Sequence, residues 1–124
     1  KDFYGETPFL YVCGYGNENL VKYLIELGAD ICKENDMGQT PLFWACDSGN
    51  ENLVKYLIEL GADFNKEEND GETLIFHAIY GGNKNILKYL MELGLDLNKE
   101  NERGETPLFK ACEKGNEEVV KFLI

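Results

Sequence analysis

The sequence predicts an all-α solenoid, in which antiparallel helix pairs stack on one another and long finger loops connect them. A Gly-x-Thr-Pro fragment returns every 33 residues, at Gly5, Gly38, Gly71 and Gly104, with Leu74 in place of Pro in the third copy. Self-similarity at one fixed period is the signature of a stacked repeat array. Each fragment is followed by the same succession of apolar and polar residues, which ends in a polar, Gly-containing stretch.

Each unit is expected to hold two helices. Thr suits the N-cap of the first helix, and Pro suits its first position because no amide donor is lost there. An Asn should cap the second helix, which carries Leu20, Val21, Leu24 and Ile25 on one apolar face and ends before Gly28. The expected helices are 8–15, 18–27, 41–48, 51–60, 74–81, 84–93, 107–114 and 117–124. They form one domain, 1–124, with units at approximately 2–34, 35–67, 68–100 and 101–124.

The second unit carries the motif in full. It reads Gly38-Gln39-Thr40-Pro41-Leu42, then a Gly49-Asn50 turn, an amphipathic stretch and Gly61-Ala62-Asp63. This pattern closely resembles the ankyrin repeat, and the resemblance covers the whole chain. The family usually has His two residues after the Pro and again in the turn. Here those positions are Leu10, Phe43, Phe76 and Phe109, and Asn17, Asn50, Asn83 and Asn116, so aromatic packing should replace the polar network of those histidines.

Composition excludes several classes of partner. The formal net charge of −11 argues against nucleic acid and anionic membrane surfaces. The chain contains neither an 18-residue apolar run nor a signal peptide, so it does not span a membrane and shows no export address. Cys13, Cys46 and Cys112 share the repeat position of Ile79, which indicates a small apolar site, and Cys32 has no obvious mate. Free thiols fit an intracellular, cytoplasmic location.

The repeats differ from one another mainly in the finger and the first helix. Residues 17–30 are identical to residues 50–63, whereas the segments that line the concave groove in the ankyrin family change. A protein whose second helices stay constant while its fingers and first helices change resembles a binding scaffold. Tyr, Trp and Met are enriched in interfaces. The predicted partner-binding residues are Phe3, Tyr4, Tyr11, Tyr15, Met37, Trp44, Asp47, His77, Tyr80, Lys110 and Glu113.

The sequence is compatible with two roles for Trp44. The residue can be a groove anchor, or it can pack against the next finger. Tyr15 and Tyr80 lie beside the Gly of a turn and are expected to be exposed. The finger carboxylates are expected to lie in solvent with ordinary pKa values, and if they select a partner, that partner is basic.

The leading functional prediction is a non-catalytic protein-interaction module that binds a protein or peptide in the groove, as the resemblance implies. We predict no catalytic site, cofactor or metal, because the chain lacks a phosphate-binding Gly motif, a Ser-His-Asp set and paired histidines. His77, the single histidine, has no metal partner in the sequence. The alternatives are a designed or consensus-like scaffold, or a self-stacking element. A monomer or weak end-to-end association is expected, and the ends lack the polar outer face of capping repeats, which suggests a piece of a longer array.

The resemblance also implies a modification. Leu57-Asp63-Phe64-Asn65 and Leu90-Asp96-Leu97-Asn98 resemble the pattern of ankyrin repeats that an asparaginyl hydroxylase modifies. Alternatively, Asn65 and Asn98 simply stabilise the turn of their finger.

Overall fold

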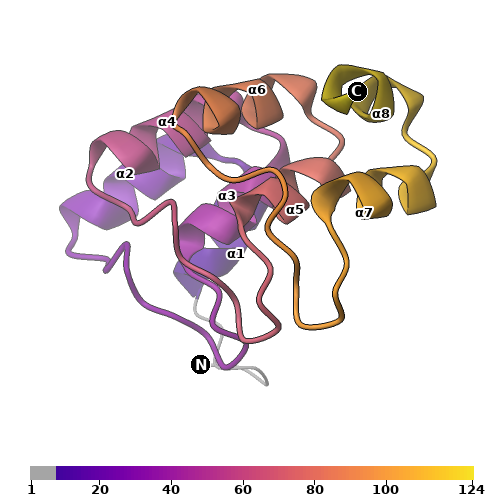
Figure 1. The fold of residues 1–124 in the computed structure, drawn as a ribbon. Helices are drawn as coiled ribbons and strands as arrows, with labels where there is room; N and C mark the ends of the chain where they lie inside the picture. Colours follow the sequence, from indigo (N-terminus) through magenta and orange to yellow (C-terminus); the bar gives the residue numbers. More distant parts are fainter. Residues whose placement is uncertain (1–7) are drawn as a thin grey trace.

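The computed structural model describes residues 8–124, and within this range it contains eight α-helices and no strand, as predicted. The helices are α1 (Pro8–Tyr15), α2 (Glu18–Glu26), α3 (Pro41–Ser48), α4 (Glu51–Glu59), α5 (Leu74–Tyr80), α6 (Lys84–Glu92), α7 (Pro107–Lys114) and α8 (Glu117–Leu123). They form two rows, with the first helix of each unit in the lower row of Figure 1 and the second in the upper row. The fingers that follow α2, α4 and α6 extend beyond the lower row, away from the upper row (Figure 1).

Polar caps define where the helices begin. The side chains of Asn17, Asn50, Asn83 and Asn116 each accept a hydrogen bond from the backbone N–H three residues later. The Thr caps are more varied than predicted. Thr106 accepts a bond of 3.2 Å from the N–H of Phe109, whereas Thr40 and Thr73 occupy the N-cap position without a side-chain bond. The second helices end before Gly28, Gly61 and Gly94, whose φ angles are positive, as a left-handed helix terminus requires.

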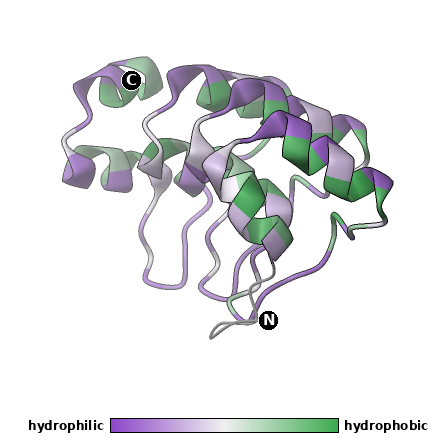
Figure 2. Ribbon diagram, turned by 180° about the vertical axis from the view of Figure 1, so that it is seen from behind, coloured by the Kyte–Doolittle hydropathy of each residue, from purple (hydrophilic) through white to green (hydrophobic). Residues whose placement is uncertain are grey.

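The core lies between the two rows and continues from one repeat to the next. Figure 2 shows that hydrophobic residues concentrate in the helices and that the fingers are mostly hydrophilic. Phe43 and Phe76, which stand where the family has His, are fully buried. Cys13 and Cys46 are also buried, and burial raises the pKa of the Cys13 thiol to about 12. All four thiols are free, and Cys112 is exposed, unlike its counterparts in earlier repeats, because no described helix packs on the far side of α7.

Hydrogen bonds at equivalent places join each repeat to the one before it. The Asn50 side chain donates 2.8 Å to the carbonyl of Gly16, and the Asn83 side chain donates 2.8 Å to the carbonyl of Gly49. The finger tips are joined by their backbones, since Asn69 N–H donates to the carbonyl of Met37 at 3.0 Å. Glu102 N–H donates in the same way to the carbonyl of Asp70 at 2.8 Å. These bonds align the fingers and so fix the side chains that the fingers carry.

Candidate functional site

The predicted binding residues that the structure describes lie on fingers and first helices, and they differ widely in exposure. Tyr15 is 83 % exposed, Met37 47 % and Tyr11 39 %, so these three side chains offer apolar area to a partner. Asp47 and Glu113 are also exposed, whereas Lys110 is partly buried and His77 is buried. Phe3 and Tyr4 lie outside the described residues.

Trp44 is partly buried, and the structure shows what holds it. Its indole ring meets the ring of Tyr11 edge to face, with ring centroids 5.5 Å apart. Its Nε1–H donates 3.0 Å to Oε1 of Gln39 at the base of the finger. A Cβ atom at Gly14 would lie only 2.9 Å from Cε3 of the indole, so the absence of a side chain at Gly14 allows Trp44 to lie across α1. Trp44 therefore both packs on the neighbouring repeat and keeps part of its ring at the surface.

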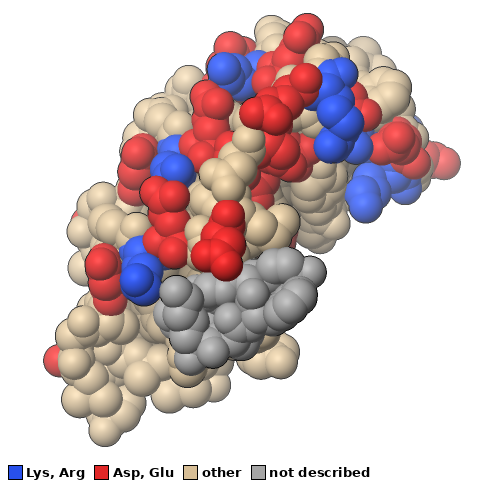
Figure 3. All heavy atoms as spheres, turned by 90° about the horizontal axis from the view of Figure 1, so that it is seen from below, with Lys and Arg blue, Asp and Glu red and all other residues tan. Residues whose placement is uncertain are grey.

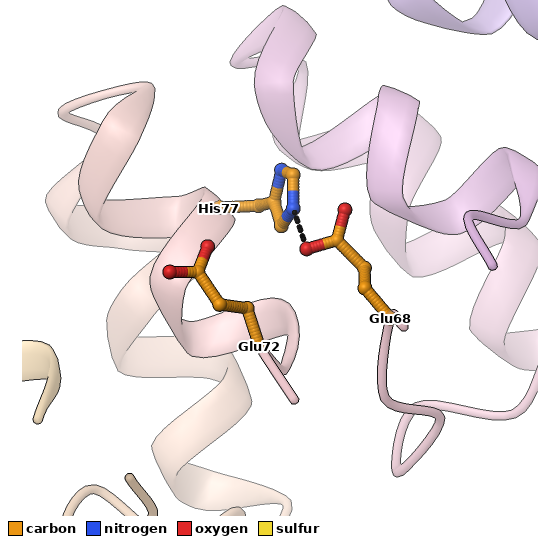
Figure 4. Close-up of side chains that lie close together, drawn as sticks. All are labelled: Glu68, Glu72 and His77. Atoms are coloured by element: carbon orange, nitrogen blue, oxygen red, sulfur yellow. Dashed lines mark ion pairs between the residues drawn. The ribbon is translucent and has the colours of Figure 1, made fainter. Parts of the chain in front are cut away.

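His77 is not the isolated residue that the sequence suggested. Its Nδ1 lies 2.8 Å from Oδ1 of Asp47, and its Nε2 lies 3.0 Å from Oε2 of Glu68. Figure 4 shows Glu68 and Glu72 with their carboxylates near the imidazole ring. Both belong to the finger between α4 and α5, residues 61–72, which opens the third unit and is called the third finger here. The expectation that the finger carboxylates lie in solvent is wrong for Glu68 and Glu72, which are only 8 % and 3 % exposed.

The third finger brings Glu68 to this position because it departs from the finger pattern. In the second and fourth units the equivalent residue is Asn35 or Asn101, and its Oδ1 accepts two backbone N–H groups of its own finger. In the third finger, Asp70 accepts the N–H of Glu72 instead, at 3.1 Å. The Glu68 side chain therefore does not have to accept the backbone N–H groups of the turn, and it reaches His77 on α5 instead.

Charge complementarity stabilises this buried cluster. Burial alone would lower the pKa of His77, but the hydrogen bond to Asp47 and the ion pair with Glu68 outweigh burial and raise it to about 10. Burial would raise the pKa of Glu68, and its interactions with His77 and Gln39 reverse that effect and hold it below its ordinary value. His77 is therefore a cation and Glu68 an anion at neutral pH. Their attraction offsets the cost of removing both charges from water.

Tyr80 belongs to the same polar region and is less available than predicted. Its hydroxyl donates to the Glu72 carboxylate, with oxygen distances of 2.7 and 2.8 Å, and the residue is partly buried. Burial and the Glu72 carboxylate raise the pKa of Tyr80, so it acts as a hydrogen-bond donor. The expectation that Tyr80 is exposed is wrong, because the residue is partly buried and its hydroxyl satisfies a buried carboxylate.

The polar contacts continue into the fourth repeat. The side-chain amide of Asn101 donates to both Glu72 and Glu105, each at 2.9 Å. Lys110 then pairs with Glu105 at 3.2 Å and with Glu113 at 3.1 Å. The bond from Asn101, together with Lys110, lowers the pKa of Glu105 to about 2. Lys110 and Glu113 therefore neutralise each other in part.

Neither Asn65 nor Asn98 holds its turn through its side chain. Both are exposed, and in each finger the backbone N–H of the Asn donates to the Asp two residues earlier, at 2.9 and 2.8 Å. The turn is thus stabilised by Asp63 and Asp96, and no hydrogen bond is made by either side-chain amide.

Figure 3, which views the finger side, shows acidic side chains gathered in a band, with basic side chains interspersed and uncharged atoms around them. Two lysines of the fingers pair with finger carboxylates, Lys66 with Glu34 at 3.2 Å and Lys99 with Glu67 at 3.3 Å. None of the described helices is long and apolar enough to cross a membrane.

Comparison with known proteins supports the interpretation of the repeat. No curated protein matches the chain. A family model described as ankyrin repeats (3 copies) matches residues 1–68 and again residues 60–124. These two matches together cover the chain, in agreement with the four helix pairs and their fingers. The chain therefore belongs to the ankyrin repeat family, whose members are generally protein-interaction modules.

Proposed function

We propose that this chain is a non-catalytic binding module that holds a protein or peptide in the concave groove formed by its fingers and first helices. The observation that carries the proposal is the group of partly or largely exposed apolar side chains Tyr11, Tyr15, Met37 and Trp44, which lies on neighbouring repeats. Aromatic residues that are held by their neighbours lose little freedom on binding, which makes them effective anchors.

The acidic finger band supports a partner that presents Lys or Arg. With a formal net charge of −11, the chain attracts basic surfaces and repels nucleic acid. Exposed charges contribute more to the association rate and to specificity than to final affinity. We therefore propose aromatic contacts as the main source of affinity and the carboxylates as the source of selection. The free thiols fit an intracellular setting for this interaction.

The test is selection from a peptide or protein library followed by matched substitutions. Tyr15→Ser removes an exposed aromatic residue from α1, and Tyr23→Ser removes one from α2, where the side chain is 57 % exposed. We expect Tyr15→Ser and Trp44→Ala to weaken a selected binder, and Tyr23→Ser to leave its affinity unchanged. Equal losses at Tyr15 and Tyr23, or a loss at Tyr23 alone, would contradict the groove proposal.

A second candidate function, self-stacking without a dedicated partner, is favoured by one feature of α7. Leu108 and Phe109 are 40 % and 50 % exposed, whereas the equivalent pair in the second repeat, Leu42 and Phe43, is buried under α5 and its neighbours. Sedimentation at increasing concentration tests this candidate, since end-to-end stacking predicts association that Phe109→Lys abolishes. A monomer at every concentration rules it out.

We also propose that Asn65 and Asn98 are sites of hydroxylation. Both side chains are exposed and make no hydrogen bond, so an enzyme could reach them. Mass spectrometry after treatment with an asparaginyl hydroxylase tests the proposal, and the absence of added oxygen on both residues ends it.

A further inference from the structure

We propose that Glu68, Glu72 and His77 form a binding site for a zinc ion. One nitrogen and two carboxylate oxygens, one ligand atom from each residue, lie within 4.8 Å of one another, and all three residues are buried. Two of the ligands come from the third finger and one from α5, so an ion between them would tie that finger to the helix row (Figure 4).

The imidazole gives the most direct indication of a site. His77 is 6 % exposed, and its Nδ1 is bonded to Asp47, which leaves Nε2 directed toward the carboxylates. Nε2 is buried and lies 3.0 Å from Oε2 of Glu68, but the geometry of this contact is not that of a hydrogen bond. In the chain without metal, the protonated Nε2 of His77 forms an ion pair with Glu68. Zinc binding would displace this proton to solvent, and the ion would take the place of the proton between the ring nitrogen and the two carboxylates.

The distances suit zinc with small adjustments. Zinc bonds to imidazole nitrogen and carboxylate oxygen are each about 2.0–2.2 Å long, which places neighbouring ligand atoms of a tetrahedral site about 3.3 Å apart. The Nε2 and Oε2 atoms of His77 and Glu68 are already near that separation at 3.0 Å. No separation among the three ligand atoms exceeds 4.8 Å, so closing any of them to about 3.3 Å requires the two side chains involved to move by less than about 1 Å each. Water completes the fourth position.

Each of the three ligands is also held by a partner behind it. Asp47 bonds to Nδ1 of His77, which is the usual carboxylate partner of a zinc-binding histidine. The Tyr80 hydroxyl and the Asn101 amide donate to Glu72, and the Gln39 amide donates to Glu68. These outer contacts orient the ligands before the ion arrives.

The ligand set favours zinc over the hard cations. Calcium and magnesium take oxygen ligands almost exclusively, and imidazole nitrogen is a poor ligand for both. Zinc accepts nitrogen and oxygen together. The exposed carboxylates of the finger tips, by contrast, offer oxygen alone and should not discriminate among these ions.

The experiment uses the chelator-treated chain with Cys32 and Cys112 changed to Ser, because both thiols are exposed and could bind zinc independently. We expect calorimetry to show one equivalent of zinc bound, and zinc to raise the melting temperature reversibly with EDTA. Because the chain has a single histidine, its two ring nitrogens can be followed by ¹⁵N NMR. Zinc should shift the Nε2 signal strongly, and calcium or magnesium should not.

Substitutions then assign the ligands. Glu68→Gln and His77→Gln should each abolish the single tight equivalent, whereas Glu102→Gln, which removes a carboxylate from an exposed finger position, should leave it unchanged. Asp47→Asn, a positioning residue, should lower zinc affinity about 10- to 100-fold. Binding that survives in Glu68→Gln, or several equal weak equivalents, would overturn the proposal. If a variant does not fold, an unshifted Nε2 signal in the parent chain decides against the site.

Discussion

Removal of the Trp44 side chain should reduce the stability of the protein and its binding at the same time. Full burial of a large aromatic side chain makes its truncation cost about 3–5 kcal/mol. Trp44 is partly buried with most of its surface covered, so its share of that cost is roughly two thirds. Its edge-to-face contact with Tyr11 contributes about 0.5–1.5 kcal/mol, and its bond to Gln39 about 1 kcal/mol. Because these contributions overlap, we expect Trp44→Ala to cost about 2–3 kcal/mol of unfolding free energy.

The assay is urea and thermal unfolding followed by circular dichroism, because Trp44 is the only tryptophan and its fluorescence disappears in the variant. For a chain of this size, 1 kcal/mol corresponds to about 4 °C, so the melting temperature should fall by roughly 10 °C. Trp44→Phe is the control. It retains an aromatic ring but loses the bond to Gln39, and it should cost about 1 kcal/mol.

Two results would refute this reasoning. A Trp44→Ala variant that melts like the parent would show that the indole does not pack on α1. A variant that loses more than about 5 kcal/mol would show that the residue behaves as fully buried core. The loss of affinity for a partner in the groove should be about 2 kcal/mol or more, measured where the variant is folded.

Three further predictions follow from contacts described above. Tyr80→Phe should destabilise the chain by about 1–3 kcal/mol in urea unfolding, because it takes a donor from the buried Glu72 carboxylate; an unchanged midpoint would contradict that contact. Leu74→Pro should lower the melting temperature, because the loss of fully buried Leu74 side-chain contacts outweighs the few tenths to about 1 kcal/mol gained by a Pro at this N1 position; an unchanged or higher melting temperature would show that the core closes over the smaller ring. The pKa of Glu105 is lowered to about 2, so its contribution to stability is complete above about pH 4.5 and lost as the pH falls toward 2; Glu105→Gln should remove that part of the acid dependence, and an unchanged acid profile would count against it.

The regular part of the fold could be predicted from the sequence because it depends on local chemistry. The Asn residues that cap the second helices and the Gly residues that end them act within a few positions of the chain, so their pattern was sufficient. The Thr caps show the limit of that approach. Thr106 bonds to its helix and Thr73 does not, although both occur in the same motif, so the motif alone does not determine whether the cap hydrogen bond forms.

The buried cluster could not be predicted in the same way, because its members come from different repeats. Asp47 lies 30 residues before His77 in the sequence, and the two meet only when α3 packs on α5. A signal was nevertheless present. Glu68 occupies a position that is Asn in the second and fourth units, and this substitution occurs in the unit that also carries the only histidine. Comparison of equivalent positions across the repeats could have linked the two.

The hydrogen bonds between repeats have a consequence for how such a chain can change in length. Asn50 and Asn83 make the same bond to the preceding turn, and the residues around them are nearly the same in both units. After duplication or deletion of a unit, the Asn amide of one repeat would therefore still face the Gly carbonyl of the repeat before it, and the same hydrogen bond would form. The array can gain or lose a repeat without loss of this hydrogen bond, whereas Trp44 and His77, which contact Gly14 and Asp47 of the preceding repeat, can be moved only together with those neighbours.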